Sequence, residues 1–145
     1  MSRSAPELEV LLVEDEPADR LLLQQGLREL DLPWKLEDTQ SGGQALARVE
    51  DPSRQPAQLV LLDLNLPGLS GLEILQRIRG NPRWRGVPVV MLTSSRRRSD
   101  IRACYEAGAN TYIIKSSKFK EMLGNLTLLH QYWTRLAELD PPLEH

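Results

Sequence analysis

Short apolar runs alternate along the chain with segments of helical periodicity. The runs Val10–Val13 and Leu59–Leu62 are apolar throughout, as is typical of parallel strands buried on both faces. Two more strands are predicted at Val87–Leu92 and Thr111–Ile114, and the more polar segment Lys35–Thr39 favours a strand near a sheet edge. The alternation predicts βαβ units built around a parallel sheet.

Helix-start patterns follow each predicted strand. A proline suits the first helical position at Pro17, and Ser41 and Ser70 each stand three residues before a Gln or Glu, which is the capping-box spacing. The predicted helices begin at or near Pro17, Ser41, Ser70, Ser99 and Ser117, and the last one runs to about Leu139.

The predicted fold class is α/β, a doubly wound sheet of five parallel strands. Right-handed crossovers are expected between the strands, and 2-1-3-4-5 is one of the common strand orders known for sheets of this class. In such sheets, ligands bind outside the carboxyl ends of the strands where the order reverses. We interpret residues 1–145 as a single domain with a core over about 8–130 and no output domain.

Composition narrows the possible functions. The chain has 145 residues, 41% of them hydrophobic and 26% charged, with a net charge of −2, and this balance predicts a globular protein without a field that attracts nucleic acid. A single cysteine, Cys104, rules out an internal disulfide, and no apolar run is long enough to span a membrane. We therefore expect a cytoplasmic protein that uses neither nucleic acid nor a membrane as partner.

Polar groups follow the predicted core strands where each strand ends. Glu14 and Asp15 follow the first strand, Asp63 follows the third, Thr93 ends the fourth and Lys115 follows the fifth. The carboxyl ends of parallel strands meet at one sheet edge, so we expect three carboxylates, a hydroxyl and an ammonium to gather there.

This set of groups suits a phosphoryl group held with a divalent cation. Neighbouring carboxylates repel one another unless a cation offsets them, and Mg²⁺ prefers carboxylate, water and phosphate oxygens. A carboxylate also serves as a nucleophile that forms aspartyl-phosphate. The interpretation requires Asp63 to be open to solvent, within ligand distance of a cation shared with Asp15.

Four segments carry a recognisable pattern: Leu11–Glu16, Leu61–Gly68, Val89–Ser95 and Gly108–Lys115. In these segments the chain resembles the response-regulator receiver family of two-component signalling, which has a flavodoxin-like (receiver) fold. The resemblance covers about residues 8–130.

The resemblance implies a role for each site residue. Asp63 is the expected phosphoacceptor, and the metal is expected to be bound by Asp15 directly and by Glu14 through water. The roles implied for the other positions are a metal ligand in the backbone carbonyl of Asn65, a switch pair in Thr93 and Tyr112, a phosphoryl partner in Lys115, and tuning of dephosphorylation by Asn65, Ser94 and Ser95.

One position departs from the family pattern. The family usually has a proline in a cis peptide directly after the lysine, whereas here Ser116 follows Lys115. A cis bond before a residue other than proline costs about 2.5–4 kcal/mol, so we predict a trans bond.

Softer motifs are similar to those of single-domain regulators that partner bacterial phytochromes. They are Glu14–Asp19, Asn81–Arg85 and Pro88–Ser95. This resemblance implies a light-regulated histidine kinase as the phosphoryl donor and an unknown downstream protein as the target. The last helix also carries a second, partial stripe, Leu128, Tyr132, Arg135 and Leu139. This stripe is either ordinary core or a frayed end of the helix, or it is part of a homodimer surface formed by the fourth helix, fifth strand and fifth helix, which is our hypothesis.

Other functions remain open at this point. A phosphatase with an aspartyl-phosphate intermediate would need an acid where Asn65 stands, and a flavin carrier would need a phosphate loop where Glu14 to Pro17 stand. A degenerate receiver that only binds other proteins, or a phosphoryl sink or relay, would share the fold. We expect a phosphorylated switch rather than an enzyme.

Overall fold

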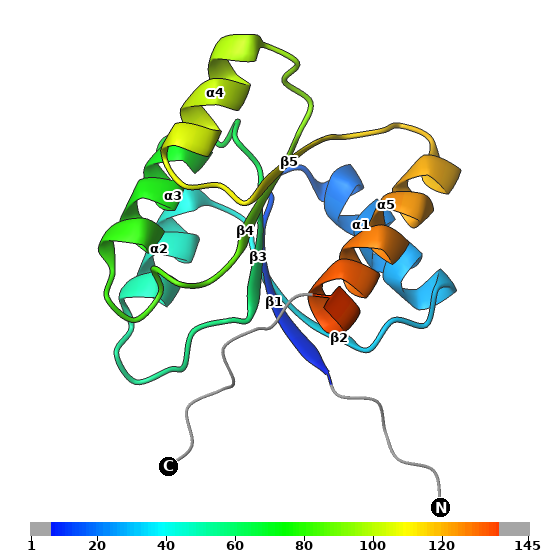
Figure 1. The fold of residues 1–145 in the computed structure, drawn as a ribbon, viewed down its shortest axis with the longest axis horizontal. Coiled ribbons are helices and arrows are strands. Elements are labelled where there is room, and N and C mark those ends of the chain that lie inside the picture. Colours follow the sequence, from blue (N-terminus) through cyan, green and yellow to red (C-terminus); the bar gives the residue numbers. More distant parts are fainter. Residues whose placement is uncertain (1–6, 137–145) are drawn as a thin grey trace, which may run out of the picture.

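The computed structural model describes residues 7–136 and has the predicted alternation of strands and helices (Figure 1). The strands are β1 Leu8–Val13, β2 Trp34–Thr39, β3 Leu59–Leu62, β4 Val89–Thr93 and β5 Thr111–Ile114. The helices are α1 Pro17–Glu29, α2 Gly42–Glu50, α3 Gly71–Gly80, α4 Arg98–Glu106 and α5 Phe119–Gln131, which a π-helical turn, η1 Tyr132–Leu136, continues.

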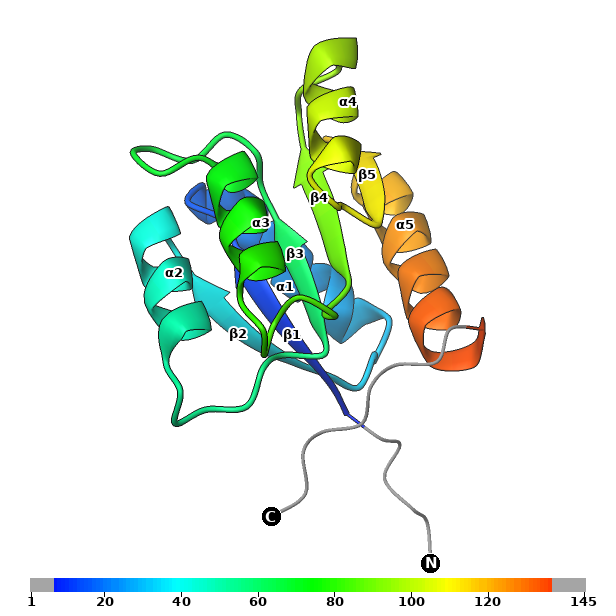
Figure 2. The ribbon, with the colours of Figure 1, turned by 60° about the vertical axis from the view of Figure 1, so that its left-hand side comes forward.

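The sheet formed by the described residues has five strands in the order β2-β1-β3-β4-β5, and every pairing is parallel (Figure 2). The predicted fold class and strand order are confirmed. The polar strand β2 lies at an edge, as its composition predicts, and β5 forms the other edge.

Two apolar layers cover the two faces of the sheet. Helices α2, α3 and α4 lie on one face and α1 and α5 on the other (Figure 1). Leu11, Val60 and Met91 point into the first layer, and Leu12, Leu61 and Val90 into the second. Neighbouring residues alternate between the layers, so strands buried on both faces are apolar at every position, as β3 is.

Some element boundaries differ from the prediction. β4 begins at Val89 because Val87 still belongs to the preceding turn, where its N–H donates to the carbonyl of Trp84 at 2.9 Å. α5 begins at Phe119 rather than Ser117, since Ser116 Oγ accepts the N–H of Lys118 at 3.1 Å and holds a turn there. The predicted end of the last helix at Leu139 lies outside the described residues.

The predicted cap at Ser70 is confirmed in full. Its hydroxyl accepts the N–H of Glu73, and the Glu73 carboxylate accepts the N–H of Ser70 in return. Ser41 caps α2 in the same way, but Gln44 bonds the N–H of Gln40 instead of completing the box. Among residues 7–136, no helix is long and apolar enough to cross a bilayer.

Candidate functional site

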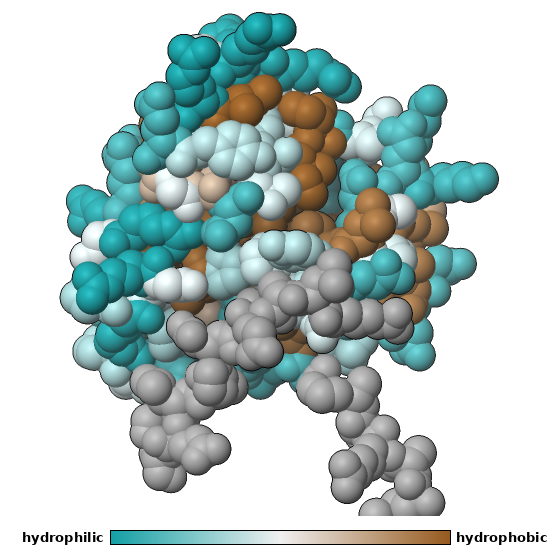
Figure 3. Space-filling model, viewed as in Figure 1, coloured by the Kyte–Doolittle hydropathy of each residue, from teal (hydrophilic) through white to brown (hydrophobic). Residues whose placement is uncertain are grey.

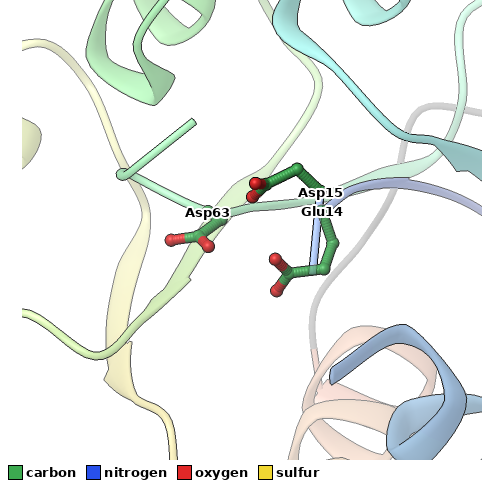
Figure 4. Close-up of side chains that lie close together, drawn as sticks. All are labelled: Glu14, Asp15 and Asp63. Carbon is green, nitrogen blue, oxygen red and sulfur yellow. The ribbon is translucent and has the colours of Figure 1, made fainter. Parts of the chain in front are cut away.

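Three carboxylates meet beyond the carboxyl ends of β1 and β3. Glu14 and Asp15 directly follow β1, and Asp63 directly follows β3, which pairs with β1 in register up to Val13 and Leu62. Each offers an oxygen, and these oxygens all lie within 4.8 Å of one another (Figure 4). The sequence prediction that these residues gather at one edge is correct.

Backbone contacts fix the acidic loop in place. The N–H of Asp63 donates to the carbonyl of Val13 at 3.0 Å, so the sheet ladder extends to the site itself. Arg20, in the first turn of α1, donates from Nη1 to the carbonyls of Glu14 and Asp15 at 3.1 and 3.2 Å. The arginine therefore ties the loop to the helix that follows it.

Lys115 reaches across from the end of β5 to the acidic group. Its Nζ lies 2.6 Å from Glu14 Oε1, 2.8 Å from Asp19 Oδ2 and 2.9 Å from Asp63 Oδ2. An ammonium has three N–H donors, and here each can serve one carboxylate. The trans prediction for Lys115–Ser116 is also confirmed, since no cis peptide bond occurs within residues 7–136.

Asp63 is less accessible than we expected. Only 6% of the residue is exposed, and the prediction that it is open to solvent is wrong for this structure. Lys115 covers one carboxylate oxygen, and the N–H of Asn65 donates to the other, Oδ1, at 3.2 Å. Asp15 is half-buried and Asn65 is exposed, so the site is accessible from their side.

Burial sets the electrostatics of the site. It raises the pKa of Glu14 to about 7, since the nearby Asp63 carboxylate reinforces the shift and the hydrogen bond from Lys115 only partly opposes it. Burial also acts to lower the pKa of Lys115, but its hydrogen bonds with Asp19, Glu14 and Asp63 outweigh this effect and raise the pKa. The lysine is thus held in its charged form among an excess of carboxylates.

The predicted switch residues lie on the adjacent strands. Thr93 ends β4 and is fully buried, and its Oγ1 accepts the N–H of Ser95 at 3.4 Å. The hydroxyl of Tyr112 donates to the carbonyl of Ser95 at 2.9 Å, and the hydroxyl of Ser95 donates to Asp100 at 2.6 Å. Ser94 is exposed on the same loop.

Sequence reasoning did not assign Asp19, Arg20 and Gly71 to the site. A Cβ on Gly71, the first residue of α3, would lie only 2.1 Å from the carbonyl oxygen of Asp63, so the helix start packs directly on the backbone of the central aspartate. Asp19 and Arg20 follow the acidic loop by one helical turn, and their closeness to it was the available signal.

The sheet order, the acidic group and the lysine together define a receiver domain. The chain matches the response regulator receiver domain family over residues 10–127 and belongs to it. This is not a family of catalytic enzymes.

Named relatives place the chain more closely within the family. It is 35% identical over 141 residues to the response regulator Rcp1 of Synechocystis, an alignment that covers 94% of this chain and 95% of that protein. The Mn²⁺-bound structure of Rcp1 has a TM-score of 0.79 at 32% identity and covers 92% of this chain and 99% of that one.

Two further solved structures are similar. The phosphorylated cyanobacterial phytochrome response regulator RcpA has a TM-score of 0.85 at 31% identity and covers 94% of this chain and all of that one, 100%. A receiver domain of a Pseudomonas aeruginosa sensor histidine kinase, with magnesium coordinated in its active-site cleft, has a TM-score of 0.72 at 32% identity, covering 88% of this chain and 98% of that one.

Proposed function

We propose that this protein is a response regulator that accepts a phosphoryl group from a histidine kinase onto Asp63. The observation that carries the proposal is the meeting of Glu14, Asp15 and Asp63 within 4.8 Å, with Lys115 Nζ 2.9 Å from Asp63. No other grouping of three or more His, Cys, Asp or Glu ligands suited to a metal occurs within residues 7–136.

The carboxylate group fits Mg²⁺ as the cofactor. Hard oxygen ligands and an excess of negative charge are what this ion requires, and relatives of the chain bind Mn²⁺ or Mg²⁺. Asp15 and Asp63 would bind the ion directly, Glu14 would bind through water, and the carbonyl of Asn65 would add a ligand. When bound, Mg²⁺ supplies charge neutralisation for the incoming phosphoryl oxygens.

The chain's own residues position and balance the transfer. An oxygen of Asp63 attacks phosphorus, the bond from phosphorus to the kinase histidine breaks, and the histidine leaves with the electron pair and takes a proton from water. Lys115 neutralises charge on the phosphoryl group because its ammonium already contacts Asp63. The N–H of Asn65 keeps the carboxylate oriented.

Thr93 and Tyr112 are the residues that transmit the change. The Thr93 hydroxyl turns from the N–H of Ser95 toward a phosphoryl oxygen, and the loop that carries Ser94 and Ser95 follows it. Tyr112 contacts the carbonyl of Ser95 and therefore moves with this loop. We propose that the side chains of Asn65, Ser94 and Ser95 control access of water to the phosphoryl group, and so its lifetime.

The surface around α4, β5 and α5 is the proposed output face and homodimer contact. Leu128 is 66% exposed and Tyr132 49% exposed, and they border a hollow of about 260 Å³ that includes Ile113 and Trp133. Figure 3 shows apolar side chains at the surface between the α4 and α5 sides of the molecule. Because a similar structure is that of a phytochrome response regulator, we propose a light-regulated histidine kinase as the phosphoryl donor and a cytoplasmic location for this protein.

The test is phosphotransfer onto wild type and Asp63→Asn. Acetyl phosphate with Mg²⁺, and a phosphorylated phytochrome histidine kinase, should each add one phosphoryl group to wild type, detected by intact mass. Asp63→Asn and an EDTA-treated sample should stay unmodified. An unmodified wild type under all of these conditions would overturn the proposal, and a monomer at high micromolar concentration with beryllofluoride would rule out the dimer.

A further inference from the structure

Asp19 is a fourth carboxylate at the site, and it has a different position from the other three. It lies in the first turn of α1, and its Oδ2 is 2.8 Å from the ammonium of Lys115. It is not a member of the carboxylate group that could hold a metal, which comprises Glu14, Asp15 and Asp63. Any effect of Asp19 on phosphorylation must therefore be exerted through Lys115 rather than through a metal ion.

The contacts of Lys115 show why a carboxylate partner outside the metal-binding group is important for holding the lysine. Two of its three carboxylate partners, Glu14 and Asp63, belong to the group that would bind the metal, and both are almost fully buried. Once those oxygens are shared with a cation and a phosphoryl group, their hold on the ammonium weakens. Asp19, whose side chain is 41% exposed, is the described carboxylate partner that stays outside this competition.

A lysine needs such an anchor because its ammonium ends a flexible four-carbon chain. Only 18% of the Lys115 side chain is exposed, and it borders a hollow between α1, α5 and the sheet whose other lining includes Leu22, Ile113 and Met122. Most of this lining is apolar, with Ser116 and Asn125 as its polar residues besides Glu14, Asp19 and Lys115 itself. Asp19 therefore keeps the charge at the mouth of the hollow, beside Asp63.

We infer that Asp19 is a positioning residue that anchors Lys115 beside the phosphoryl group during transfer onto Asp63. The inference rests on the proposed function. It deepens that function by adding a residue that touches neither metal nor phosphoryl group and acts through the ammonium alone.

The direction of the change in phosphorylation rate when Asp19 is removed distinguishes anchoring of Lys115 from a simple effect of the Asp19 charge. If Asp19 were only a negative charge near the site, its removal would speed reaction with an anionic donor. If it anchors Lys115, its removal slows the reaction because the ammonium is less often in place. The amide of Asp19→Asn still accepts a hydrogen bond, so the asparagine variant should fall between wild type and Asp19→Ala.

The experiment measures the rate constant of phosphorylation at saturating Mg²⁺ and acetyl phosphate, and Mg²⁺ affinity by calorimetry. Asp19→Ala should lower the rate constant about 5-fold, with Asp19→Asn intermediate, while the Mg²⁺ dissociation constant stays within about 2-fold. Glu29→Gln, at the exposed far end of α1, removes one negative charge away from the site and should match wild type.

A double-mutant cycle with Lys115→Ala decides whether Asp19 acts through the lysine. In the Lys115→Ala background, Asp19→Ala should have no further effect on the rate. An equal effect in both backgrounds, an unchanged rate, or faster reaction in the Asp19 variants would overturn the inference. Failure of wild type itself to react would instead count against the proposed function, so the two failures are distinguishable.

Discussion

The amino ends and the carboxyl ends of the strands, called here the amino-end edge and the carboxyl-end edge of the sheet, balance buried charge in opposite ways. At the amino-end edge, Arg79 donates to the carbonyls of Gly108, Arg85 and Val87 and to the side chain of Asn110, at 2.7–3.1 Å. At the carboxyl-end edge, Glu14, Asp19 and Asp63 share Lys115 as their cation, and Asp15 lies beside Glu14 and Asp63. The first edge is satisfied internally, whereas the second keeps an excess of negative charge that a ligand can neutralise.

The difference shows which contacts hold the fold and which serve a ligand. The neutral acceptors around the Arg79 guanidinium require no further ligand. This arrangement, called the arginine cage below, joins α3 to the turn before β4 and the turn before β5. Like charges in a largely buried group of carboxylates reduce stability until a cation binds. We therefore expect substitutions at the amino-end edge to affect stability alone, and substitutions at the carboxyl-end edge to affect both stability and ligand response.

The largest effect is expected from Gly71→Ala. A Cβ at this position would lie 2.1 Å from the carbonyl oxygen of Asp63 and 2.7 Å from Cα of Leu64, so backbone must move at the carboxyl-end edge. The expected loss is about 3 kcal/mol in the free energy of unfolding, measured with urea, together with weaker Mg²⁺ binding. Gly80→Ala, at the other end of α3 with nothing within 4 Å, is the matched control and should be neutral.

Arg79→Met tests the amino-end edge. It keeps much of the stem but leaves the carbonyls of Gly108 and Val87 without their donor, and we expect a loss of about 2 kcal/mol in urea unfolding. Mg²⁺ affinity and phosphorylation should stay at wild-type values. Arg77→Met, on the same helix as Arg79, removes an exposed arginine that pairs with Glu50 of α2 at 3.6 Å, and it should cost about 0.5 kcal/mol or less. Altered metal binding in Arg79→Met would contradict the separation of the two edges.

Glu14→Gln tests the excess negative charge at the carboxyl-end edge through the pH dependence of the free energy of unfolding. The pKa of Glu14 is raised from 4.5 to about 7 by burial, so between these values the folded protein binds more protons than the unfolded chain. The carboxyl group therefore favours folding below pH 4.5, and this contribution is lost as pH rises through about 7. In EDTA, Glu14→Gln should gain about 2 kcal/mol relative to wild type between pH 5 and pH 8.

Urea unfolding at several pH values measures this gain. Added Mg²⁺ should reduce it, because the ion stabilises the wild-type carboxylate, and Arg79→Met should keep the wild-type pH dependence. Parallel stability profiles for wild type and Glu14→Gln in EDTA would show that the carboxylates are already balanced without a cation.

The sequence predicted the fold and most of the site because both depend on local order. Apolar runs such as Leu59–Leu62 define buried strands, and groups directly after parallel strands must meet at one edge, which places Glu14, Asp63 and Lys115 together. Asp19 and Gly71 were missed since their contacts depend on the direction in which α1 and α3 leave the sheet. The low exposure of Asp63 was missed because it depends on the side-chain conformation of Lys115.

The smallest effect is expected from Tyr112→Phe. The lost hydroxyl donates to the carbonyl of Ser95 on a loop that water can reach, so we expect a change of about 0.5 kcal/mol, well below that for Arg79→Met. Hydrogen exchange of the Ser95 and Arg97 amides, which bond to Thr93 Oγ1 and Ser95 Oγ, should nevertheless quicken several-fold. A loss near 2 kcal/mol, or unchanged exchange, would mean that the carboxyl-end loop is held as firmly as the arginine cage.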